Sequence, residues 1–355
     1  MNIQFFGDLS LDGIYCEPQQ HPIIRENLAW LSKELGPADF RVINWESPLW
    51  GNGEVNQLKT PRLCTTREAA EAILPLKINV ALLANNHIYD NGISGVENTL
   101  NFFHESGIEY VGIGTDQADV RKFIVLERDS IKVAVLNYVS KETNPKLPSD
   151  AKILLNYFDI DSVEADIKSL KEKVNYIVLQ VHWGETELVR IPTPDQRRIA
   201  RRLIEAGANV FVGHHVHCLQ GWEKWENGII CYSLGNFLFG THLTLPGQVH
   251  SPRTADTRRI GVLNINFSSE GVDTEWSYFY RQKDKITVQM DTHEKVRRLH
   301  QSLCKPISYS ERKLWSVYRI EKKLMPFRTF IDKNGGLINA ISSIRLKQIK
   351  LLRKI

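Results

Sequence analysis

The sequence predicts an α/β fold in which strands and helices alternate along most of the chain. Short runs rich in β-branched and aromatic residues recur through the first two thirds and are typical of buried strands. Segments with helical spacing of apolar residues separate many of these runs, which favours a largely parallel sheet with helices over its faces. From about residue 258 to 290, apolar and polar residues alternate, which predicts antiparallel strands that close one side of a sandwich.

The expected elements follow one another along the chain. Buried strands are predicted at Ile3–Phe6, Phe40–Ile43, Val80–Leu83, Lys122–Leu126, Val133–Leu136, Tyr176–Val181, Asn209–Val212 and Gly228–Tyr232. Helices are predicted at Ile23–Leu35, Thr66–Leu74, Gly95–Ser106, Ser162–Glu172 and Pro194–Ala206. The last of these has Thr193 as its expected N-cap and a proline in its first turn, where a missing N–H is tolerated. Antiparallel strands are predicted at Gly261–Phe267, Glu275–Tyr280 and Ile286–Met290.

Length and composition are those of a globular protein. The 355 residues suit one large α/β domain with an appendage, and 42% hydrophobic with 24% charged residues excludes a disordered chain. The N-terminal stretch MNIQFFGDLS lacks the basic and apolar regions of a signal peptide, and no apolar run reaches the roughly 18 residues of a membrane-spanning helix. Five scattered cysteines without a C-x-x-C pair favour reduced thiols, so we expect a cytoplasmic protein.

Charge divides the chain into two parts, which we expect to be a domain over residues 1–293 and a helical extension over 294–355. The extension holds sixteen Lys and Arg against four Asp and Glu, a net charge of +12, and since the whole chain carries +4, this leaves −8 for the domain. Its final segment has apolar residues near one helical face and Lys and Arg on the other. Such a segment can contact the inner membrane surface or a partner protein, or dock on its own body. No nucleic-acid-binding motif accompanies the basic charge, which disfavours a nucleic-acid partner.

Polar residues that can bind metal follow five of the predicted strands. Because ligands of open α/β folds collect at the carboxyl ends of strands, these residues are expected to meet. The five groups are GDLSLDG with Asp8, NWESP with Asn44 and Glu46, ANNHIYDNG with Asn86, His87 and Asp90, HWGETE with His182, and GHHVH with His214, His215 and His217. Any one of them can be a helix cap, a turn or a satisfied structural histidine. Three imidazoles within four residues are harder to explain by packing, and the five groups together are harder still.

The chemistry of these side chains favours a transition-metal site. Imidazole, carboxylate and amide oxygen ligands suit Mn, Fe or Zn, and differ from the thiolate sites of structural zinc and the oxygen cages of calcium. Two divalent ions about 3.5–4 Å apart can clamp a phosphoryl group and activate a water molecule as the nucleophile. A histidine that is not a ligand can then protonate the leaving oxygen.

The ordered motifs GD, N-x-E, ANNHxxDxG, HWG-x-E, GHHVH and YSLGNF, over roughly residues 1–245, closely resemble the CapA family of capsule and poly-γ-glutamate biosynthesis proteins, within the metallophosphatase superfamily. The resemblance implies a four-layer αββα, calcineurin-like fold with a site for two divalent ions. The metal ligands that it implies are Asp8, Glu46, Asn86, His182, His215 and His217. It implies His87 as the general acid.

Two departures from the wider superfamily concern the number of metal ions. Classical phosphoesterases have D-x-H on the first strand, where this chain has Asp8-Leu9-Ser10 and so lacks an imidazole. Their bridging GD-x-x-D is replaced by Asn44-Trp45-Glu46, so Glu46 is the candidate bridging ligand. Whether His214 or the pair His215 and His217 binds metal stays open at this stage.

Further residues are expected to support the site. Asp90, one helical turn after His87, can orient that imidazole, or it can serve as a helix cap or turn former. A guanidinium makes bidentate contacts with phosphate or carboxylate, so arginines near the motifs are candidates for gripping substrate, the alternative being a solvated surface charge. The expected substrate-binding residues are Asn44, Arg62, Arg190, His214 and Asn236.

The leading hypothesis is a metal-dependent hydrolase that acts on a phosphoester or related anionic bond in capsule, exopolysaccharide or poly-γ-glutamate biosynthesis. A first alternative is an accessory protein that binds poly-γ-glutamate or another anionic polymer through its metal without turnover. A second is a hydrolase or transferase of γ-glutamyl amides, in which the same activated water attacks a carbonyl.

Overall fold

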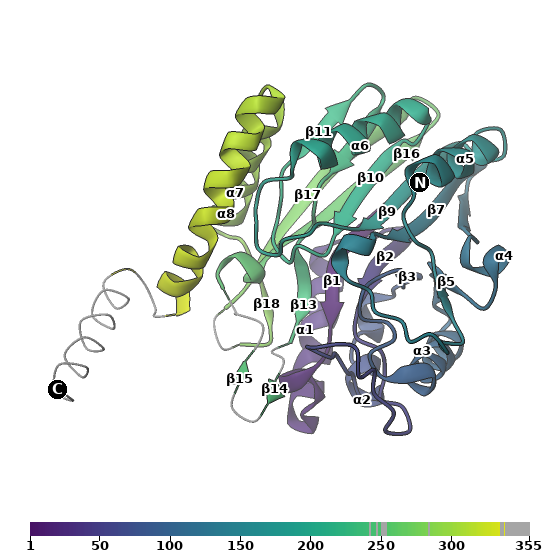
Figure 1. Ribbon diagram of the computed structural model, residues 1–355, viewed down its shortest axis with the longest axis vertical. Coiled ribbons are helices and arrows are strands. Elements are labelled where there is room, and N and C mark those ends of the chain that lie inside the picture. Colours follow the sequence, from purple (N-terminus) through teal and green to yellow (C-terminus); the bar gives the residue numbers. More distant parts are fainter. Residues whose placement is uncertain (241–242, 246–247, 250–253, 283–284, 334–336, 338–355) are drawn as a thin grey trace.

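The computed structural model describes residues 1–240, 243–245, 248–249, 254–282, 285–333 and 337. Two large β-sheets pack face to face, and helices cover the outer face of each (Figure 1). The predicted four-layer αββα architecture is therefore confirmed. A C-terminal helical extension is also present, as predicted.

The first sheet has the strand order β18-β17-β16-β1-β2-β3-β4, and β13 pairs with β1 beyond the point where β16 ends. Its strands are β1 (Asn2–Ser10), β2 (Phe40–Trp45), β3 (Val80–Leu82), β4 (Glu109–Val111), β13 (Asn236–Phe239), β16 (Arg259–Ser268), β17 (Gly271–Arg281) and β18 (Val288–Met290). The first five are parallel to one another. The last three are antiparallel, as predicted, and they extend this sheet because β16 pairs with β1, β17 with β16 and β18 with β17.

The second sheet has the order β11-β12-β10-β9-β7-β6. Its strands are β6 (Ile124–Arg128), β7 (Ile131–Val139), β9 (Tyr176–His182), β10 (Val210–His214), β11 (Trp222–Trp225) and β12 (Gly228–Cys231). The four central strands are parallel and the two edge strands antiparallel. Two small ribbons pair β5 (Ile113–Gly114) with β8 (Leu154–Leu155) and β14 (Leu243–Leu245) with β15 (Gln248–Val249).

Apolar helix faces cover the sheets on their outer sides. The helices are α1 (His21–Glu34), α2 (Arg67–Glu71), α3 (Gly92–Ser106), α4 (Gln117–Val120), α5 (Ile160–Leu170), α6 (Pro194–Ala206), α7 (Lys295–Cys304) and α8 (Glu311–Lys333). Short 3-10 turns lie at Gly13–Cys16, Pro18–Gln20, Leu74–Leu76, Lys141–Thr143, Asp256–Arg258 and Lys305–Ser308. Helices α1, α2 and α3 pack on the first sheet, and α5 and α6 on the second. Helix α6 begins at the predicted Thr193 cap, which forms a capping box with Gln196.

The interior between the sheets is built from β-branched side chains. Ile3, Val42 and Val80 of the first sheet meet Val178 and Val212 of the second, and all are buried. Burying such a side chain contributes roughly 1.5–3 kcal/mol, so this layer is a large part of the folding free energy. Strands and helices alternate along the sequence because helices must cover the outer faces of the sheets while this layer fills the space between them.

Sequence reasoning missed seven short strands, each of two to four residues. These are β4, β5, β8, β11, β13, β14 and β15. Strand β4 is mostly exposed and β11 is a half-exposed edge strand, so neither has the apolar run that marks a buried strand. The helix predicted over Thr66–Leu74 is shorter than expected and ends before a 3-10 turn.

The helices after Glu294 pack against the domain instead of extending away from it as a separate unit. Leu303 of α7 joins Leu314 and Tyr318 of α8 in an apolar cluster with Val189 and Ile191 of the domain. In Figure 1, α8 lies beside α7 at one side of the sandwich. Of the amphipathic tail predicted beyond residue 333, all but position 337 lies outside the described residues. No helix among those described is both long and apolar enough to cross a lipid bilayer.

A buried histidine joins α7 to the sheet. His300 is completely buried and its ring packs on Trp276 at 4.4 Å between centroids. Its Nε2 lies 2.9 Å from the carbonyl oxygen of Gln220, and its Nδ1 lies 3.0 Å from the hydroxyl of Tyr278. The neutral ring satisfies both contacts, since Nε2–H donates and Nδ1 accepts. Burial lowers the pKa of His300 to about 4, against a weaker opposing effect of the Gln220 carbonyl.

This histidine should make the fold sensitive to acid. Above pH 6.5 the ring is neutral in both states, and as the pH falls towards 4 only the unfolded chain takes up the proton, so stability is lost. We expect His300→Gln, which does not titrate, to remove up to about 3 kcal/mol of the loss between pH 7 and pH 4. The free energy of unfolding at each pH is measured by urea unfolding, with tryptophan fluorescence as the signal. The exposed His104→Gln serves as control and should retain the wild-type pH dependence; equal slopes for all three proteins would contradict the prediction.

Candidate metal centre

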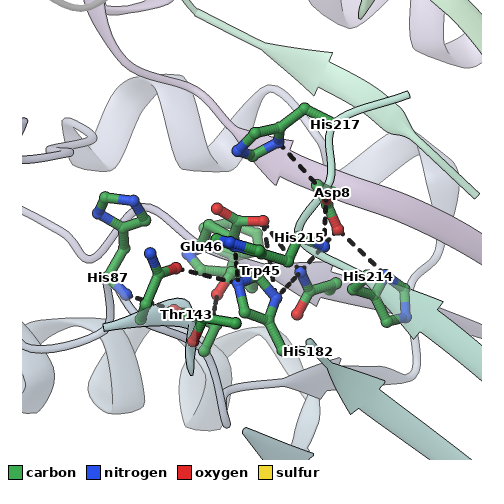
Figure 2. Close-up of polar contacts among 12 residues, drawn as sticks. Asp8, Trp45, Glu46, His87, Thr143, His182, His214, His215 and His217 are labelled. Atoms are coloured by element: carbon green, nitrogen blue, oxygen red, sulfur yellow. Dashed lines mark hydrogen bonds and ion pairs between the residues drawn. The ribbon is translucent and has the colours of Figure 1, made fainter. Parts of the chain in front are cut away.

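Strand register brings the predicted metal ligands to one edge of the sandwich. In the first sheet Asp8 lies opposite Asn44 on one side and Asn236 on the other. In the second sheet His182 lies opposite His214. The carboxyl ends of parallel strands share an edge, so the two sheets present these side chains to each other (Figure 2).

Asp8 is placed by an irregularity in β1. The register of β1 shifts on both sides of Asp8, as at a β-bulge, which redirects the side chain. The neighbouring Gly7 permits a close approach of two backbones, because a Cβ there would lie 2.0 Å from the carbonyl oxygen of Gly235. Gly235 itself has a φ of 66°, a left-handed conformation that glycine adopts readily. The bulge and the two glycines therefore set the position of the carboxylate.

The Asp8 carboxylate is buried and is held by histidines. His214 Nδ1 lies 3.1 Å from Oδ1, and His217 Nδ1 lies 3.4 Å from Oδ2. The backbone N–H of His215 also donates to Oδ2, at 3.1 Å. Burial alone would raise the pKa of Asp8, but the contacts with His214 and His217 hold it well below its ordinary value. The group is therefore an ionised carboxylate at neutral pH.

Glu46 is buried beside it with less compensation. Its Oε1 accepts a hydrogen bond from Asn44 Nδ2 at 3.1 Å, and the same amide donates to Asp8 Oδ1 at 2.9 Å. Glu46 Oε2 and Asn44 Oδ1 are buried oxygens without a hydrogen-bond partner among the described residues. Burial and the negative charge of Asp8 raise the pKa of Glu46 well above its ordinary value.

Two imidazoles face these carboxylates. His182 is fully buried, with Nδ1 3.9 Å from Glu46 Oε1 and Nε2 3.0 Å from Asn86 Oδ1. His215 Nδ1 lies 3.1 Å from His182 Nε2. Burial and the neighbouring His215 lower the pKa of His182 well below its ordinary value, and burial lowers the pKa of His215 to about 4. Both rings are therefore neutral, which is the state in which imidazole binds a metal ion.

The GHHVH segment holds its last two histidines in a left-handed backbone conformation. His215 has a φ of 92° and His217 a φ of 56°, values that are uncommon for residues other than glycine. Such conformations persist where the surrounding structure enforces them and are frequent at functional sites. His217 Nδ1 also lies 2.9 Å from Asn236 Oδ1. Burial would lower the pKa of His217, but contact with Asp8 and the charge of Glu46 raise it to about 10.

His87 and Asp90 form a pair at the opening of the site. His87 Nδ1 lies 2.7 Å from Asp90 Oδ2, and this carboxylate oxygen also accepts the backbone N–H of Leu63 at 2.7 Å. The His87 backbone N–H is held in turn by Asn85 Oδ1 at 3.0 Å. Asp90 is thus a positioning partner of the imidazole, the first of the two readings that the sequence allowed.

A pocket of about 280 Å³ opens onto this centre. Three of the predicted site histidines line it, together with residues of the segment that follows β2 and of the loops that follow β7 and β9. Its lining residues are Lys59, Thr60, Pro61, Asn86, His87, Glu142, Thr143, Asn144, Glu185, Glu187, His215, His217 and Phe239. A substrate in this pocket would contact His87 on one side and the GHHVH imidazoles on the other.

The residues present fit a divalent cation. Asp8, Glu46 and His182 each offer one ligand atom, and these atoms lie within 4.8 Å of one another. The unpartnered buried oxygen of Glu46 and the protonation of His217 both indicate negative charge that needs a cation. Carboxylate, amide and imidazole donors together suit Mn, Fe or Zn. Ser10, which stands where the classical phosphoesterase pattern has an imidazole, donates instead to Asp12 at 2.8 Å.

Two arginines predicted to bind substrate lie elsewhere. Arg190 is paired with Glu321 of α8 at 2.8 Å and lies 3.8 Å from Asp256, so its guanidinium docks α8 on the domain. Arg62 is exposed and does not line the pocket. Neither guanidinium lines the pocket, because sequence proximity to a motif does not determine which way a loop side chain points.

Three other residues predicted to bind substrate lie behind the predicted metal ligands. His214 has Gln180 Oε1 at 2.9 Å from its Nε2 and Asp8 at its other nitrogen, so it supports the carboxylate from inside the protein. Asn44 and Asn236 are buried and orient Asp8, Glu46 and His217. These three predictions are corrected: the residues belong to the site but do not line the pocket. Of the three clustered histidines, His215 and His217 reach the pocket.

Sequence reasoning missed two residues of the site. Gln180 supports His214, and the signal was a single amide within the apolar strand YIVLQVH. Lys59 lines the pocket from the loop after β2, where nothing in the local sequence distinguishes it from a surface lysine.

Comparison with known proteins agrees with this geometry. The chain is 32% identical over 221 residues to "Capsule biosynthesis protein CapA" of Bacillus anthracis, covering 59% of this chain and 52% of the relative. It is 30% identical over 251 residues to "PGA biosynthesis protein CapA" of Bacillus subtilis (strain 168), covering 67% and 63%. The chain thus spans between half and two thirds of the length of these relatives.

Solved structures of similar layout include a 5'-nucleotidase precursor from Thermus thermophilus, with a TM-score of 0.47, 15% identity and coverage of 86% of this chain and 59% of that one. Another is the calcineurin-like phosphoesterase YfkN from Bacillus subtilis, with a TM-score of 0.45, 14% identity and coverage of 87% and 99%. Since these scores are below 0.5, the fold assignment depends on the strand order and layering described above.

A family model described as "Bacterial capsule synthesis protein PGA_cap" matches residues 2–241. This range is more than half of the chain and includes every predicted metal ligand. The chain therefore belongs to the bacterial capsule synthesis protein PGA_cap family.

Proposed function

We propose that this protein is a metal-dependent hydrolase that acts on a phosphoester or related anionic bond in capsule, exopolysaccharide or poly-γ-glutamate biosynthesis. The observation that carries the proposal is the convergence of buried Asp8, Glu46 and His182 beneath a pocket that also exposes His87. A cluster of buried polar residues that served only to stabilise the fold would not need an open pocket beside it. Membership of the PGA_cap family supports the polymer context.

The ligands that we assign to the cation are Asp8, Glu46, Asn86, His182, His215 and His217, and we propose room for two ions. A divalent cation bound there supplies Lewis acidity and lowers the pKa of a water molecule towards neutrality. The protein contributes the orientation of its ligands through hydrogen bonds from residues behind them, which fix ring tautomers and carboxylate rotamers. His214, Asn44 and Asn236 have these contacts.

His87 is the candidate proton donor to the leaving oxygen. Asp90 accepts a hydrogen bond from Nδ1–H, so a proton on Nε2 is the one that can be transferred. The ring lines the pocket, whereas Asp90 lies behind it. The pair thus places a proton where a leaving group would depart.

Removal of a metal ligand should abolish both metal binding and activity. We expect His182→Ala to reduce bound Mn, Fe or Zn, measured by elemental analysis, and to lower hydrolysis of p-nitrophenyl phosphate at least about 100-fold. The exposed His104→Ala is the matched control and should retain both. Hydrolysis that persists in EDTA and in His182→Ala would refute the mechanism. Metal-dependent polymer binding without turnover of phosphoesters or γ-glutamyl amides would instead favour an accessory role.

Removal of the proton donor should depend on the leaving group. We expect His87→Ala to lower kcat about 10²–10⁴-fold for a phenyl phosphate ester, because its leaving group needs a proton. The loss should be much smaller for p-nitrophenyl phosphate, whose leaving group departs as a stable anion. Metal content measured in parallel should stay at the wild-type level. An equal loss for both esters would show that His87 does not act as an acid.

A further inference from the structure

One cation in the pocket has no role in the metal centre or in proton transfer. Lys59 is only 6% exposed, yet its side chain lines the same pocket as His87, His215 and His217. It follows β2 by fourteen residues and belongs to the loop before α2. A lysine on such a loop is ordinarily solvated, so its burial here is unusual.

The ammonium group of Lys59 is poorly compensated. Its one hydrogen bond among the described residues goes to the carbonyl oxygen of Asn144, at 3.4 Å, although an ammonium has three donors. Among the residues that the structure describes, no carboxylate oxygen lies within 4.0 Å of the Lys59 ammonium nitrogen. Burial lowers the pKa of Lys59, and the more distant charges of Asp90 and Glu46 oppose this effect. Burying an ammonium group with so few partners is unfavourable unless a further anion compensates its charge.

The backbone around Lys59 is anchored on both neighbouring loops. The N–H of Asn56 donates to the Asp90 carbonyl at 2.9 Å, and the Asn56 side-chain amide donates to the Lys146 carbonyl at 2.6 Å. The N–H of Lys59 donates to Asn56 at 3.2 Å, and that of Leu63 to the Asp90 carboxylate at 2.7 Å. The loop that carries Lys59 is therefore tied to the same residue that orients His87.

Apart from Lys59 and the histidines, the charged side chains that line the pocket are glutamates. Glu142 accepts the backbone N–H of Gly184 at 2.7 Å, and all three glutamates, Glu142, Glu185 and Glu187, are exposed. Among the described lining residues Lys59 is the only Lys or Arg. Lys59 can thus offer an anionic substrate an ammonium group at this position of the wall, which Arg62 and Arg190 do not supply.

We infer that Lys59 binds an anionic oxygen of the substrate, phosphoryl or carboxylate, and holds it in the pocket beside His87. This inference rests on the proposed function, because it places the substrate of the same site. It explains why a lysine is buried in a pocket with three glutamates. It also assigns substrate recognition to a residue of the loop after β2 in place of the two arginines.

Direct binding of small anions to the full-length, metal-loaded protein tests this. We expect Lys59→Met, which keeps the apolar stem of the side chain, to weaken binding of inorganic phosphate or of glutarate at least about tenfold in calorimetry. The exposed Lys146→Met on the adjoining loop should stay within about twofold of wild type. The titrant that depends on Lys59 identifies the class of anion. Unchanged binding of both anions to folded Lys59→Met would overturn the inference.

A measurement on the wild-type protein covers the case in which the variant does not fold. Phosphate or glutarate should slow acetylation of Lys59 by acetic anhydride, read by peptide mass spectrometry, without slowing that of Lys146. Equal Lys59 labelling with and without the anions would contradict the inference. These readouts do not need turnover, so a failed hydrolase assay with Lys59-dependent binding would count against the proposed reaction only.

Discussion

The site depends on two carboxylates buried next to each other. Asp8 and Glu46 share hydrogen bonds from one amide, that of Asn44, and neither is exposed to solvent. Two adjacent buried negative charges are unfavourable unless positive charge compensates them. Burial and then the charge of Asp8 raise the pKa of Glu46, and against the effect of burial the contact with Asp8 and the charge of Glu46 raise the pKa of His217. A cation at the centre would satisfy the same requirement.

The αββα fold makes this arrangement possible. Each large sheet supplies its ligands from the carboxyl ends of parallel strands, so the strand register decides which side chains are neighbours. The bulge in β1 and the left-handed backbone of His215 and His217 are local departures from regular geometry. Both occur at the ligands and both redirect a side chain. The regular strands thus hold the site residues in place, and the residues with irregular backbone geometry set the direction of their side chains.

The pocket side of the centre is organised around Asp90. Its carboxylate orients His87, and its backbone and side chain anchor the loop that carries Lys59. A proton donor and an anion-binding cation would therefore keep a constant position relative to each other and to the metal ligands. Such preorganisation is what lets charged groups act on a substrate without a further cost of rearrangement. The extension after Glu294 contributes by another route, since α8 pairs with Arg190 on the domain.

The sequence by itself determined the layers and most of the polar residues that converge at the candidate metal centre. Apolar runs with period 2 or 3.6 report burial directly, and polar residues at strand ends such as Asp8 and His182 stand out against them. Tertiary structure alone decided the direction of each loop side chain. It sent Arg190 to Glu321, placed His214 behind Asp8, and buried Lys59 in the pocket. The reason is physical: a loop's orientation is set by contacts with distant segments, which leave no periodic pattern in the sequence.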